Sequence, residues 1–423
     1  MNKKFNFAII SIVSTLICIG IVVFGLTYTK NSDTPKKSKN KEKSTESFNI
    51  KIIKSLNVNE NFLISPYSIE VALNMLNEGA GGNTKKEISN LINDREIADV
   101  SIKNRVNIAN AVFIKDKYKN IVKDEFKNTL VKKYDSEVLY DMFKTPFVIN
   151  NWVNEKTDGM IEKVIDEISE DFVLGLANAI AIDVQWLNPF ECNETTGQEF
   201  TKDNGKKIKV QMMHNSFRTN DVKYLESDDA KGIILPYLPY NSKTGEVDRG
   251  KDSNLEFIGI LPNSNVSSYI DGLTDEKLDG LINSASDASG KNVIKVSLPR
   301  FTYEYDAEDF SKALRSLGII DAFNPSKADF SKIASMKDLE NENLYVNKAV
   351  HKTFIDLNET GTKAAAVTFF GIDSFSTAID NNVTNITFDK PFIYMIRDNK
   401  TKEVLFFGAV YEPNVWNGST CSK

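Results

Sequence analysis

The sequence is poor in the residue types that most enzymes use for acid–base and nucleophilic chemistry. Its 423 residues include only two histidines, His214 and His351. No nucleophile-elbow motif accompanies them, and they lie far apart in the sequence, without the spacing of a His-Glu-x-x-His zinc site. A glycine-rich stretch, "GAGGNTKK", follows an expected helix and lacks the Gly-Lys-Ser/Thr ending of a phosphate-binding loop. The sequence therefore predicts no enzyme, no metal site and no cofactor.

The chain also lacks a disulfide framework and an excess of positive charge. Cys18 lies within the first apolar stretch, and Cys192 and Cys421 show no metal-ligand spacing, so we expect no disulfide bond. The 52 Lys and Arg residues are outnumbered by 58 Asp and Glu, which gives a net charge of −6. A dedicated nucleic-acid binder usually has a basic surface, so we expect no nucleic-acid partner.

Charged residues are missing from one long stretch near the N-terminus. Residues 5–26, which follow Lys3 and Lys4, are mostly apolar. A run of roughly 22 residues exceeds a secretory h-region and meets the ~20 that cross a bilayer as a helix. No Ala-x-Ala-like cleavage site follows it. Residues 1–29 are therefore predicted to be an uncleaved signal anchor, with a cleaved signal peptide as the alternative. Either way we expect an extracellular or cell-surface protein, which is membrane-anchored by an N-terminal helix or secreted after cleavage.

The rest of the chain divides into a linker, one domain and a short tail. Residues 30–47, "KNSDTPKKSKNKEKSTES", are polar and charged and predict a solvated linker. Folded sequence begins near Phe48 and continues to residue 413 without a repeat or a second linker. Residues 414–423, "NVWNGSTCSK", form a C-terminal tail.

Within residues 48–413, helical patterns come first and strand patterns second. Residues 69–76 follow helical spacing that Gly79 ends, and "INNWVNEKTDGMIEKVID" predicts a second helix. "LANAIAIDVQW" suits a strand that is buried on both faces. From about Phe200 the period changes to two, and "ITFDKPFIYMIRDN" with "KEVLFFGAV" predicts a hairpin. This order indicates a single α+β domain.

Seven motifs agree in order and spacing with those of the serpins, the serine protease inhibitor superfamily. They are "NFLISPYSIEVALNML", "INNWVNEKTDGMI", "ANAIAIDVQWLNPF", "VSLPRFTYEY", "LGIIDAFNPSKADFSKI", "VNKAVHKTFIDLNETGTKAAAV" and "FDKPFIYMIRDNKTKEVLFFGAV". The sequence resembles a serpin over essentially all of residues 48–413, and its Lys-, Asn- and Ile-rich composition suggests a bacterial-type member. The resemblance implies three β-sheets, about nine helices and an exposed reactive loop near the C-terminus.

The resemblance assigns the reactive loop to a stretch that differs from its surroundings. Residues 359–370, "ETGTKAAAVTFF", are mostly small or apolar. In an inhibitory serpin a protease cleaves this loop, and its N-terminal side inserts into the main sheet as a new central strand. Gly361 is expected to supply freedom in φ and ψ at the hinge. Because alternate residues of a strand share a face, the inserted hinge would turn one set inward and the other outward: Thr362, Ala364 and Ala366 inward, Lys363 and Ala365 outward.

The resemblance also predicts the bond that a protease cuts. In inhibitory serpins this bond lies at a set distance along the chain from the hinge glutamate, and from Glu359 that distance ends at Phe375 and Ser376. A phenylalanine before the cut suits chymotrypsin-like or subtilisin-like serine proteases, or papain-like cysteine proteases. Three residues nearby stay open as alternatives: Ile372, Thr377 and Ile379.

Further positions match family residues beneath and beside the main sheet. A polar cluster that controls sheet opening corresponds to Ser65, Ser68, Asn178 and His351, with His351 hydrogen-bonded in the core. Trp186 corresponds to the tryptophan where the loop first enters the sheet. Glu359 and Arg300 match a hinge ion pair, to which we assign the ~0–1 kcal/mol of an exposed pair.

Three functions follow from these observations. The first is a monomeric suicide-substrate inhibitor that traps the acyl-enzyme by loop insertion, which the small inward residues of the hinge favour. The second is a non-inhibitory serpin that acts as a carrier, chaperone or surface-binding module. The third is a surface hydrolase, which the shortage of histidines and the missing nucleophile motif disfavour.

Overall fold

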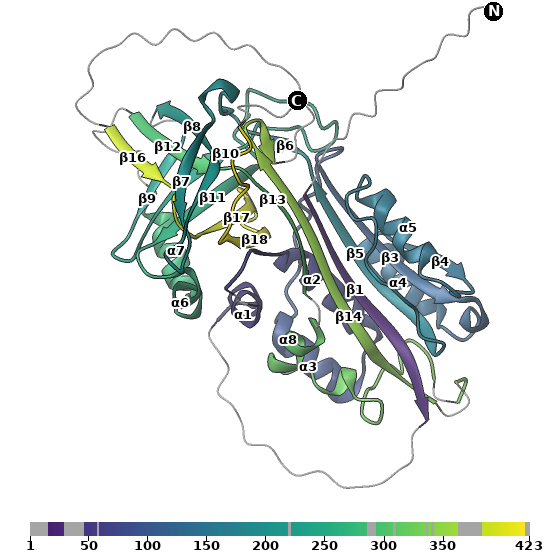
Figure 1. The fold of residues 1–423 in the computed structure, drawn as a ribbon. Coiled ribbons are helices and arrows are strands. Elements are labelled where there is room, and N and C mark those ends of the chain that lie inside the picture. The colour runs from purple at the N-terminus through teal and green to yellow at the C-terminus, as the bar shows by residue number, and fades with distance from the viewer. Residues whose placement is uncertain are drawn as a thin grey trace, which may run out of the picture.

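Three β-sheets and eight α-helices make up the described part of the chain (Figure 1). The computed structural model describes residues 16–28, 46–56, 59–218, 221–285, 293–307, 310–335, 337–339, 342–362 and 383–418. The predicted α+β class is confirmed, and the helix count is close to the nine expected.

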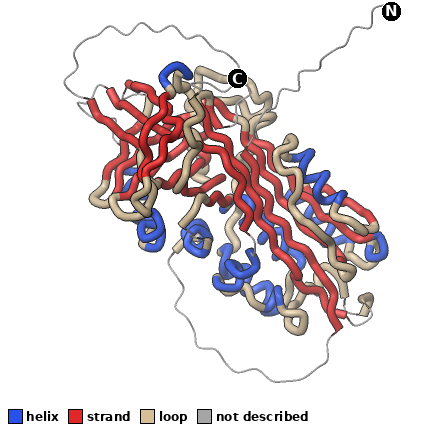
Figure 2. The backbone as a smooth tube through the Cα atoms, viewed as in Figure 1, coloured by secondary structure: helices blue, strands red, loops and turns tan. Residues whose placement is uncertain are grey.

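The largest sheet has eight strands and runs the length of the molecule (Figure 2). Its order is β4-β3-β5-β1-β14-β15-β6, and β13 pairs with β14 off this path. The strands are β1 (Leu16–Tyr28), β3 (Val106–Lys115), β4 (Ser136–Asp141), β5 (Phe172–Ile182), β6 (Val184–Gln185), β13 (Phe301–Ala307), β14 (Glu342–Asn358) and β15 (Gly361–Thr362). Every residue of β5 is buried, as predicted for a strand covered on both faces.

The two smaller sheets lie at one end of the molecule. One has six strands: β2 (Phe62–Ile64), β9 (Lys223–Glu226), β10 (Ala230–Pro236), β11 (Leu255–Pro262), β17 (Phe392–Asp398) and β18 (Val404–Val410). The other has four: β7 (Thr196–Thr201), β8 (Lys207–Arg218), β12 (Val293–Pro299) and β16 (Val383–Thr387). The predicted hairpin is confirmed by antiparallel pairing of β17 with β18. The start of the C-terminal tail joins the four-stranded sheet, where Val415 bridges to Val210.

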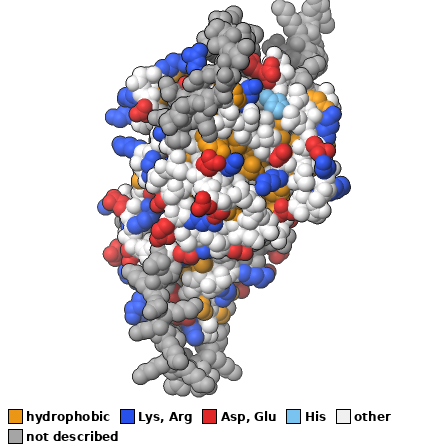
Figure 3. Space-filling model, turned by 90° about the vertical axis from the view of Figure 1, so that its left-hand side faces the viewer, with side chains coloured by type: hydrophobic (Ala, Val, Ile, Leu, Met, Phe, Trp, Pro, Cys, Tyr) orange, Lys and Arg blue, Asp and Glu red, His pale blue; other side chains and the backbone are white. Residues whose placement is uncertain are grey.

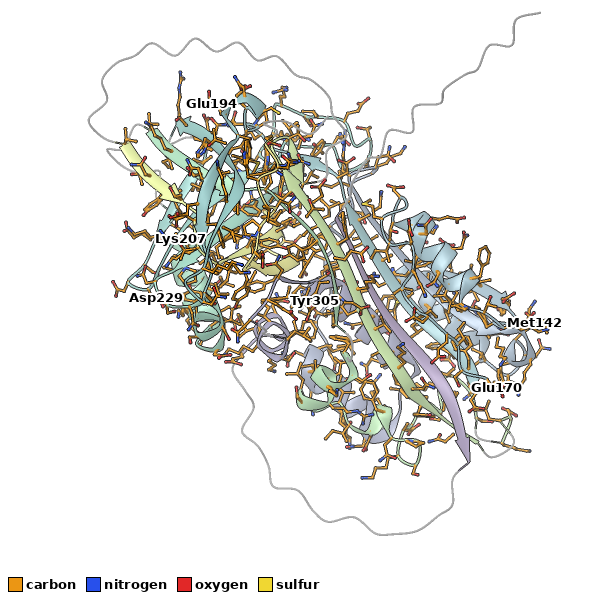
Figure 4. All side chains as sticks on the ribbon, viewed as in Figure 1. Met142, Glu170, Glu194, Lys207, Asp229 and Tyr305 are labelled. Atoms are coloured by element: carbon orange, nitrogen blue, oxygen red, sulfur yellow. The ribbon has the colours of Figure 1, made fainter. Side chains whose placement is uncertain are left out.

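Helices cover both faces of the largest sheet, and two further helices lie beside the smaller sheets (Figure 1). The helices are α1 (Phe48–Ser55), α2 (Pro66–Gly79), α3 (Gly82–Ile92), α4 (Asp124–Tyr134), α5 (Phe147–Lys156), α6 (Val266–Asp271), α7 (Asp275–Asn283) and α8 (Phe310–Ser316). Helix α2 belongs to the main core, whereas Trp152 and Val153 of α5 pack with Ala177 and Ala179 of β5 in a second core. Figure 4 shows side chains filling the space between the elements, with Tyr305 of β13 near the middle of the molecule.

Helix α5 is shorter than the sequence pattern predicts. It ends at Lys156, and after the capping residue Thr157 come Asp158 and Gly159, which have φ angles of 50° and 83°. This left-handed backbone breaks the helix, although Ile161 and Ile165 beyond it remain buried in the second core.

The described part of the apolar N-terminal segment forms a strand in the structure. Residues 16–28, part of the predicted signal anchor, lie as β1 between β5 and β14. The described part of the chain contains no helix that is both long and apolar enough to span a membrane. The physical reason is that a continuous apolar run suits a bilayer helix and equally a strand in a sheet that is covered on both faces. Membrane anchoring by residues 1–29 stays a prediction, and the predicted linker falls almost wholly outside the described residues.

One cysteine departs from expectation. Cys192 is disulfide-bonded, whereas the sequence predicted no disulfide. Sequence spacing does not show which distant cysteines the fold brings together, so the pattern alone missed the bond. The side chain of its partner lies outside the described residues.

Candidate functional site

The hinge lies where β14 leaves the large sheet. After Asn358 the chain turns through Glu359 and Thr360 and re-enters the sheet as β15. There Thr362 pairs with Leu357 of β14 and, on its other side, with Val184 of β6. The first hinge residues are therefore already part of the sheet. The remaining hinge and bait positions lie outside the described residues: Lys363, Ala364, Ala365, Ala366, Phe375 and Ser376.

Gly361 is needed for a different reason than the one predicted. Its φ is not positive, so the residue does not use the freedom peculiar to glycine. Instead, a Cβ atom at this position would lie 2.1 Å from the Val184 carbonyl oxygen and 2.8 Å from the Gln185 Cα. Because both contacts are to backbone, only glycine allows β15 to approach β6 so closely.

A buried aromatic pair receives the hinge. The Thr362 side chain is fully buried, and its hydroxyl lies 2.6 Å from the Tyr237 hydroxyl. Trp186 stacks on Tyr237, with ring centroids 4.6 Å apart and an interplanar angle of 8°. The Trp186 backbone N–H donates to Thr360 at 2.9 Å, and its indole N–H donates to the Asn358 carbonyl at 2.9 Å. Trp186 therefore contacts the first residues of the hinge, and its predicted role where the loop enters the sheet stays a prediction.

The hinge ion pair is more buried than expected. Glu359 Oε2 lies 3.6 Å from Arg300 Nε, and the side chains are only 8% and 12% exposed. The other carboxylate oxygen accepts a hydrogen bond of 2.7 Å from the buried Thr195 hydroxyl, and the Glu359 carbonyl accepts one of 2.9 Å from Phe190 N–H. The expectation of an exposed pair was wrong, because the turn tucks Glu359 under residues that are distant in sequence. Breaking a buried pair leaves a desolvated charge, so we expect a larger effect than ~0–1 kcal/mol.

The structure brings the four residues of the predicted polar cluster together. Each is fully buried. His351 Nε2 accepts from Ser65 N–H at 3.1 Å, and Ser65 Oγ accepts from Ser68 N–H at 3.0 Å at the start of α2. The Ser68 hydroxyl in turn donates to Asn178 Oδ1. His351 on β14 and Asn178 on β5 are thus linked through the N-terminus of α2, beneath the strand that separates them. The predicted control of sheet opening stays a prediction.

Three residues of the site were missed by sequence reasoning. Tyr237 receives the hinge, Thr195 holds Glu359, and Asn110 on β3 accepts a 2.8 Å hydrogen bond from the Asn178 amide. Each comes from a segment remote from the hinge, and no local motif marks it. Only the tertiary contacts identify these residues.

The two histidines lie in different sheets. His214 belongs to β8, where Nδ1 lies 2.9 Å from the Ser297 hydroxyl and Nε2 lies 3.1 Å from the Thr196 hydroxyl. Burial lowers the pKa of His214, so its neutral form is favoured in the folded protein. Neighbouring strands therefore hold the ring in place, far in the topology from His351 of the eight-stranded sheet.

The fold and the hinge define a serpin, and comparison with known proteins agrees. The serpin (serine protease inhibitor) family model matches residues 43–413. The chain belongs to the serpin family. It is 31% identical to Serpin B8 from Homo sapiens, over 86% of this chain and 96% of that protein. It is 29% identical to a serine protease inhibitor from Cyanea capillata, over 84% of this chain and 93% of that protein.

A solved structure shows the same architecture. The crystal structure of the thermophilic serpin tengpin in the native state superposes with a TM-score of 0.71 at 30% sequence identity. The alignment covers 92% of this chain and 100% of the tengpin chain. The overall architecture is therefore that of an established fold.

Proposed function

We propose that this serpin is a suicide-substrate inhibitor of serine endopeptidases. The observation that carries the proposal is the seated hinge: β15 lies between β14 and β6, and Thr362 is buried against Tyr237. Once the place between β5 and β14 is vacant, a loop that has begun to enter the sheet needs no further nucleation to extend, because each added residue joins an existing ladder. Relatives named as serine protease inhibitors support the same reading.

The proposed mechanism is a race between insertion and hydrolysis. The protease serine attacks the Phe375 carbonyl, the Phe375–Ser376 bond breaks, and the new amine of Ser376 leaves with the C-terminal fragment. The enzyme is then held as an ester on Phe375. Insertion of the freed strand moves Phe375 and the enzyme attached to it before water can hydrolyse the ester. Small residues after Thr362 favour a fast insertion, so we propose chymotrypsin-like or subtilisin-like targets, and papain-like cysteine proteases as a further class.

We also propose that the protein acts outside the cell as a monomer. The disulfide bond of Cys192 supports an oxidising location, since such bonds persist mainly in exported proteins. On the face drawn in Figure 3, basic and acidic side chains are interspersed, which is not the single-signed surface of a nucleic-acid binder.

One observation favours the non-inhibitory alternative. An inhibitory serpin needs the place between β5 and β14 for its cleaved loop, and in this structure β1 lies there. A serpin held in this state could act as a carrier, chaperone or surface-binding module, but it would not trap a protease. The two readings are separated by testing the chain with and without its N-terminal segment.

The test of inhibition uses residues 30–423, the form left after removal of the N-terminal segment. With chymotrypsin or subtilisin we expect an SDS-stable adduct and a released peptide that begins at Ser376. The nicked protein should also melt at a higher temperature than the intact one. Thr362→Arg, which places a charge in the buried position beside Tyr237, should convert the protein into a substrate. Clean cleavage without any adduct would contradict the proposal, as would continued trapping by the Thr362→Arg variant.

A further inference from the structure

Strand β1 fills a single slot in the middle of the large sheet. On one side its backbone pairs with β5, from Leu16 opposite Ile182 to Gly25 opposite Phe172. On the other side it pairs with β14, from Ile17 opposite Phe354 to Tyr28 opposite Glu342. Both pairings are antiparallel, and Figure 1 shows the purple strand between its two neighbours. The N-terminal segment is thus a central strand of the domain.

The hinge strand β15 occupies the top of the same slot. Thr362 pairs with Val184, and two residues further down that edge of the sheet Ile182 pairs with Leu16 of β1. Both strands run antiparallel to β14 as well. A strand continued from Thr362 in the β15 register would place residue 364 opposite Ile182, which is the position that Leu16 holds.

The register on the other side of the slot agrees. Thr362 lies opposite Leu357 of β14, so a continued strand would place residue 365 opposite Phe354. Ile17 holds that position. The two sides therefore give the same offset between the reactive loop and β1. The strand that begins at residue 16 therefore has the direction and register that a strand continued from residue 364 would have.

Glycine falls at the one position of β1 that is flanked by the polar cluster. Gly20 lies in register with Asn178 on β5 and with His351 on β14. The side chains of these two residues bond beneath the strand to Ser68 and Ser65. A residue without a side chain leaves that polar cluster undisturbed, so the hydrogen bonds persist with the strand seated.

The composition of the segment suits this slot. Residues 16–28 contain no proline and no charge, and they include β-branched residues at several successive positions. Three alanines of β5 that belong to the second core, Ala177, Ala179 and Ala181, lie in register with Ile21, Ile19 and Ile17. A strand buried on both faces needs such a sequence.

We propose that the slot between β5 and β14 is a binding site for residues 16–28 of this chain, and that the segment keeps the loop out until a lipid bilayer takes it up. Most of this strand belongs to the apolar run of residues 5–26, which has the length of a membrane-spanning helix, so the bilayer competes with the sheet for it. With the segment in the membrane the slot is open to the cleaved loop. The second half of this inference rests on the proposed inhibitory function.

A proline substitution in residues 16–28 can distinguish binding in the sheet from insertion into a membrane. Proline is tolerated in a membrane helix but not in a central strand, where it removes a ladder hydrogen bond. The variant is Ile19→Pro in the full chain, and the matched control is Ile10→Pro, which lies in the same apolar run but before β1. Hydrogen exchange of β5 and β14 amides reports the seated strand, and exchange of β17 and β18 amides checks that the rest remains folded.

In the full chain in buffer without detergent, we expect Ile19→Pro to speed exchange in β5 and β14 by at least about tenfold. Ile10→Pro should match the wild type, and β17 and β18 should be unchanged in all three proteins. Transferring the wild type into phosphatidylcholine vesicles should speed exchange in β5 and β14 in the same way. Equal exchange in the wild type and Ile19→Pro would contradict the proposal that residues 16–28 bind in the slot. Unchanged exchange of the wild type in vesicles would contradict the proposal that a bilayer releases them.

A parallel chymotrypsin assay distinguishes the two proposals. We expect several-fold more SDS-stable adduct from Ile19→Pro than from the wild type or Ile10→Pro. Equal amounts of adduct from all three proteins would contradict the proposal that residues 16–28 keep the reactive loop out of the sheet. If exchange shows the opened slot but no protein forms an adduct, the inhibitory function fails while the occupant of the slot is supported.

Discussion

The hydroxyl groups of Thr362 and Tyr237 lie 2.6 Å apart in a fully buried contact. This contact joins the first residues of the hinge to the aromatic stack at the top of the large sheet, where Tyr237 and Trp186 lie parallel. It means that the hinge is held by a specific polar bond and not by packing alone. Four predictions follow from the contacts around it and beneath the sheet.

Replacing Tyr237 with phenylalanine should loosen the hinge. The ring stack with Trp186 would remain, but the buried Thr362 hydroxyl would lose its partner, which costs about 1–3 kcal/mol. We expect slower insertion, seen as a larger fraction of cleaved, untrapped inhibitor with chymotrypsin. Tyr118→Phe, in a buried tyrosine remote from the hinge, is the control. An unchanged partition for the Tyr237 variant would show that the bond does not matter.

Replacing Gly361 with alanine should prevent the hinge from entering between β14 and β6. The added Cβ would clash with the Val184 carbonyl oxygen at 2.1 Å, and this neighbour is backbone of β6, which cannot rotate away as a side chain could. We expect the variant to be cleaved as a substrate. Gly280→Ala in α7 is the matched control, because a Cβ there meets nothing within 4 Å. If both variants trap protease equally well, the close approach at Gly361 is not required.

Breaking the Glu359–Arg300 pair should destabilise the hinge by more than an exposed pair would. Glu359→Gln keeps an acceptor for Thr195 but removes the charge that faces Arg300, and we expect a loss of about 1–3 kcal/mol. A double-mutant cycle with Arg300→Gln, measured by chemical denaturation, isolates the coupling between the two side chains. A coupling energy near zero would show that the Glu359–Arg300 pair contributes no more to stability than an exposed ion pair does.

A buried carboxyl group on α2 should make stability fall as pH rises. Glu70 is fully buried and shares the Arg95 guanidinium with Glu403, at 2.7 Å from Arg95 Nε to Glu70 and 2.6 Å from Nη1 to Glu403. Burial raises the pKa of Glu70 to about 7, above its value of 4.5 when unperturbed. The folded state therefore holds this proton more tightly than the unfolded state. The contribution is complete below pH 4.5 and is lost as pH rises through 7, by up to about 3 kcal/mol.

The measurement is the melting temperature of the wild type and Glu70→Gln between pH 5.5 and 8. His214, whose pKa burial lowers, acts in the opposite direction over part of this range, so the difference between the two proteins is the informative quantity. We expect the wild type to lose stability relative to Glu70→Gln as pH rises. Parallel curves would refute the raised pKa.

Much of this molecule follows from local pattern. The continuous apolar run of β5, the helix that ends at Gly79 and the β17–β18 hairpin were all predicted, because burial on two faces, helix termination and hairpin geometry leave signals within a few residues. The family motifs also located Trp186 and the residues beneath the sheet.

The remainder depends on contacts between distant segments. The burial of Glu359, the partner role of Tyr237 and the disulfide of Cys192 arise where loops far apart in sequence meet. Periodicity carries no information about such meetings. For the same reason, the steric need for Gly361 was mistaken for a need for backbone freedom.

The family and the α+β class could be predicted from the amino-acid sequence alone, because both leave signals in ordered motifs and in short-range hydrophobic spacing. The place of residues 16–28 could not be predicted in this way and depends on the tertiary fold. The hydrophobic effect favours removal of an apolar run from water, but it does not select between a lipid bilayer and a protein core. In this structure β5 and β14 bury residues 16–28 by pairing with them on both sides.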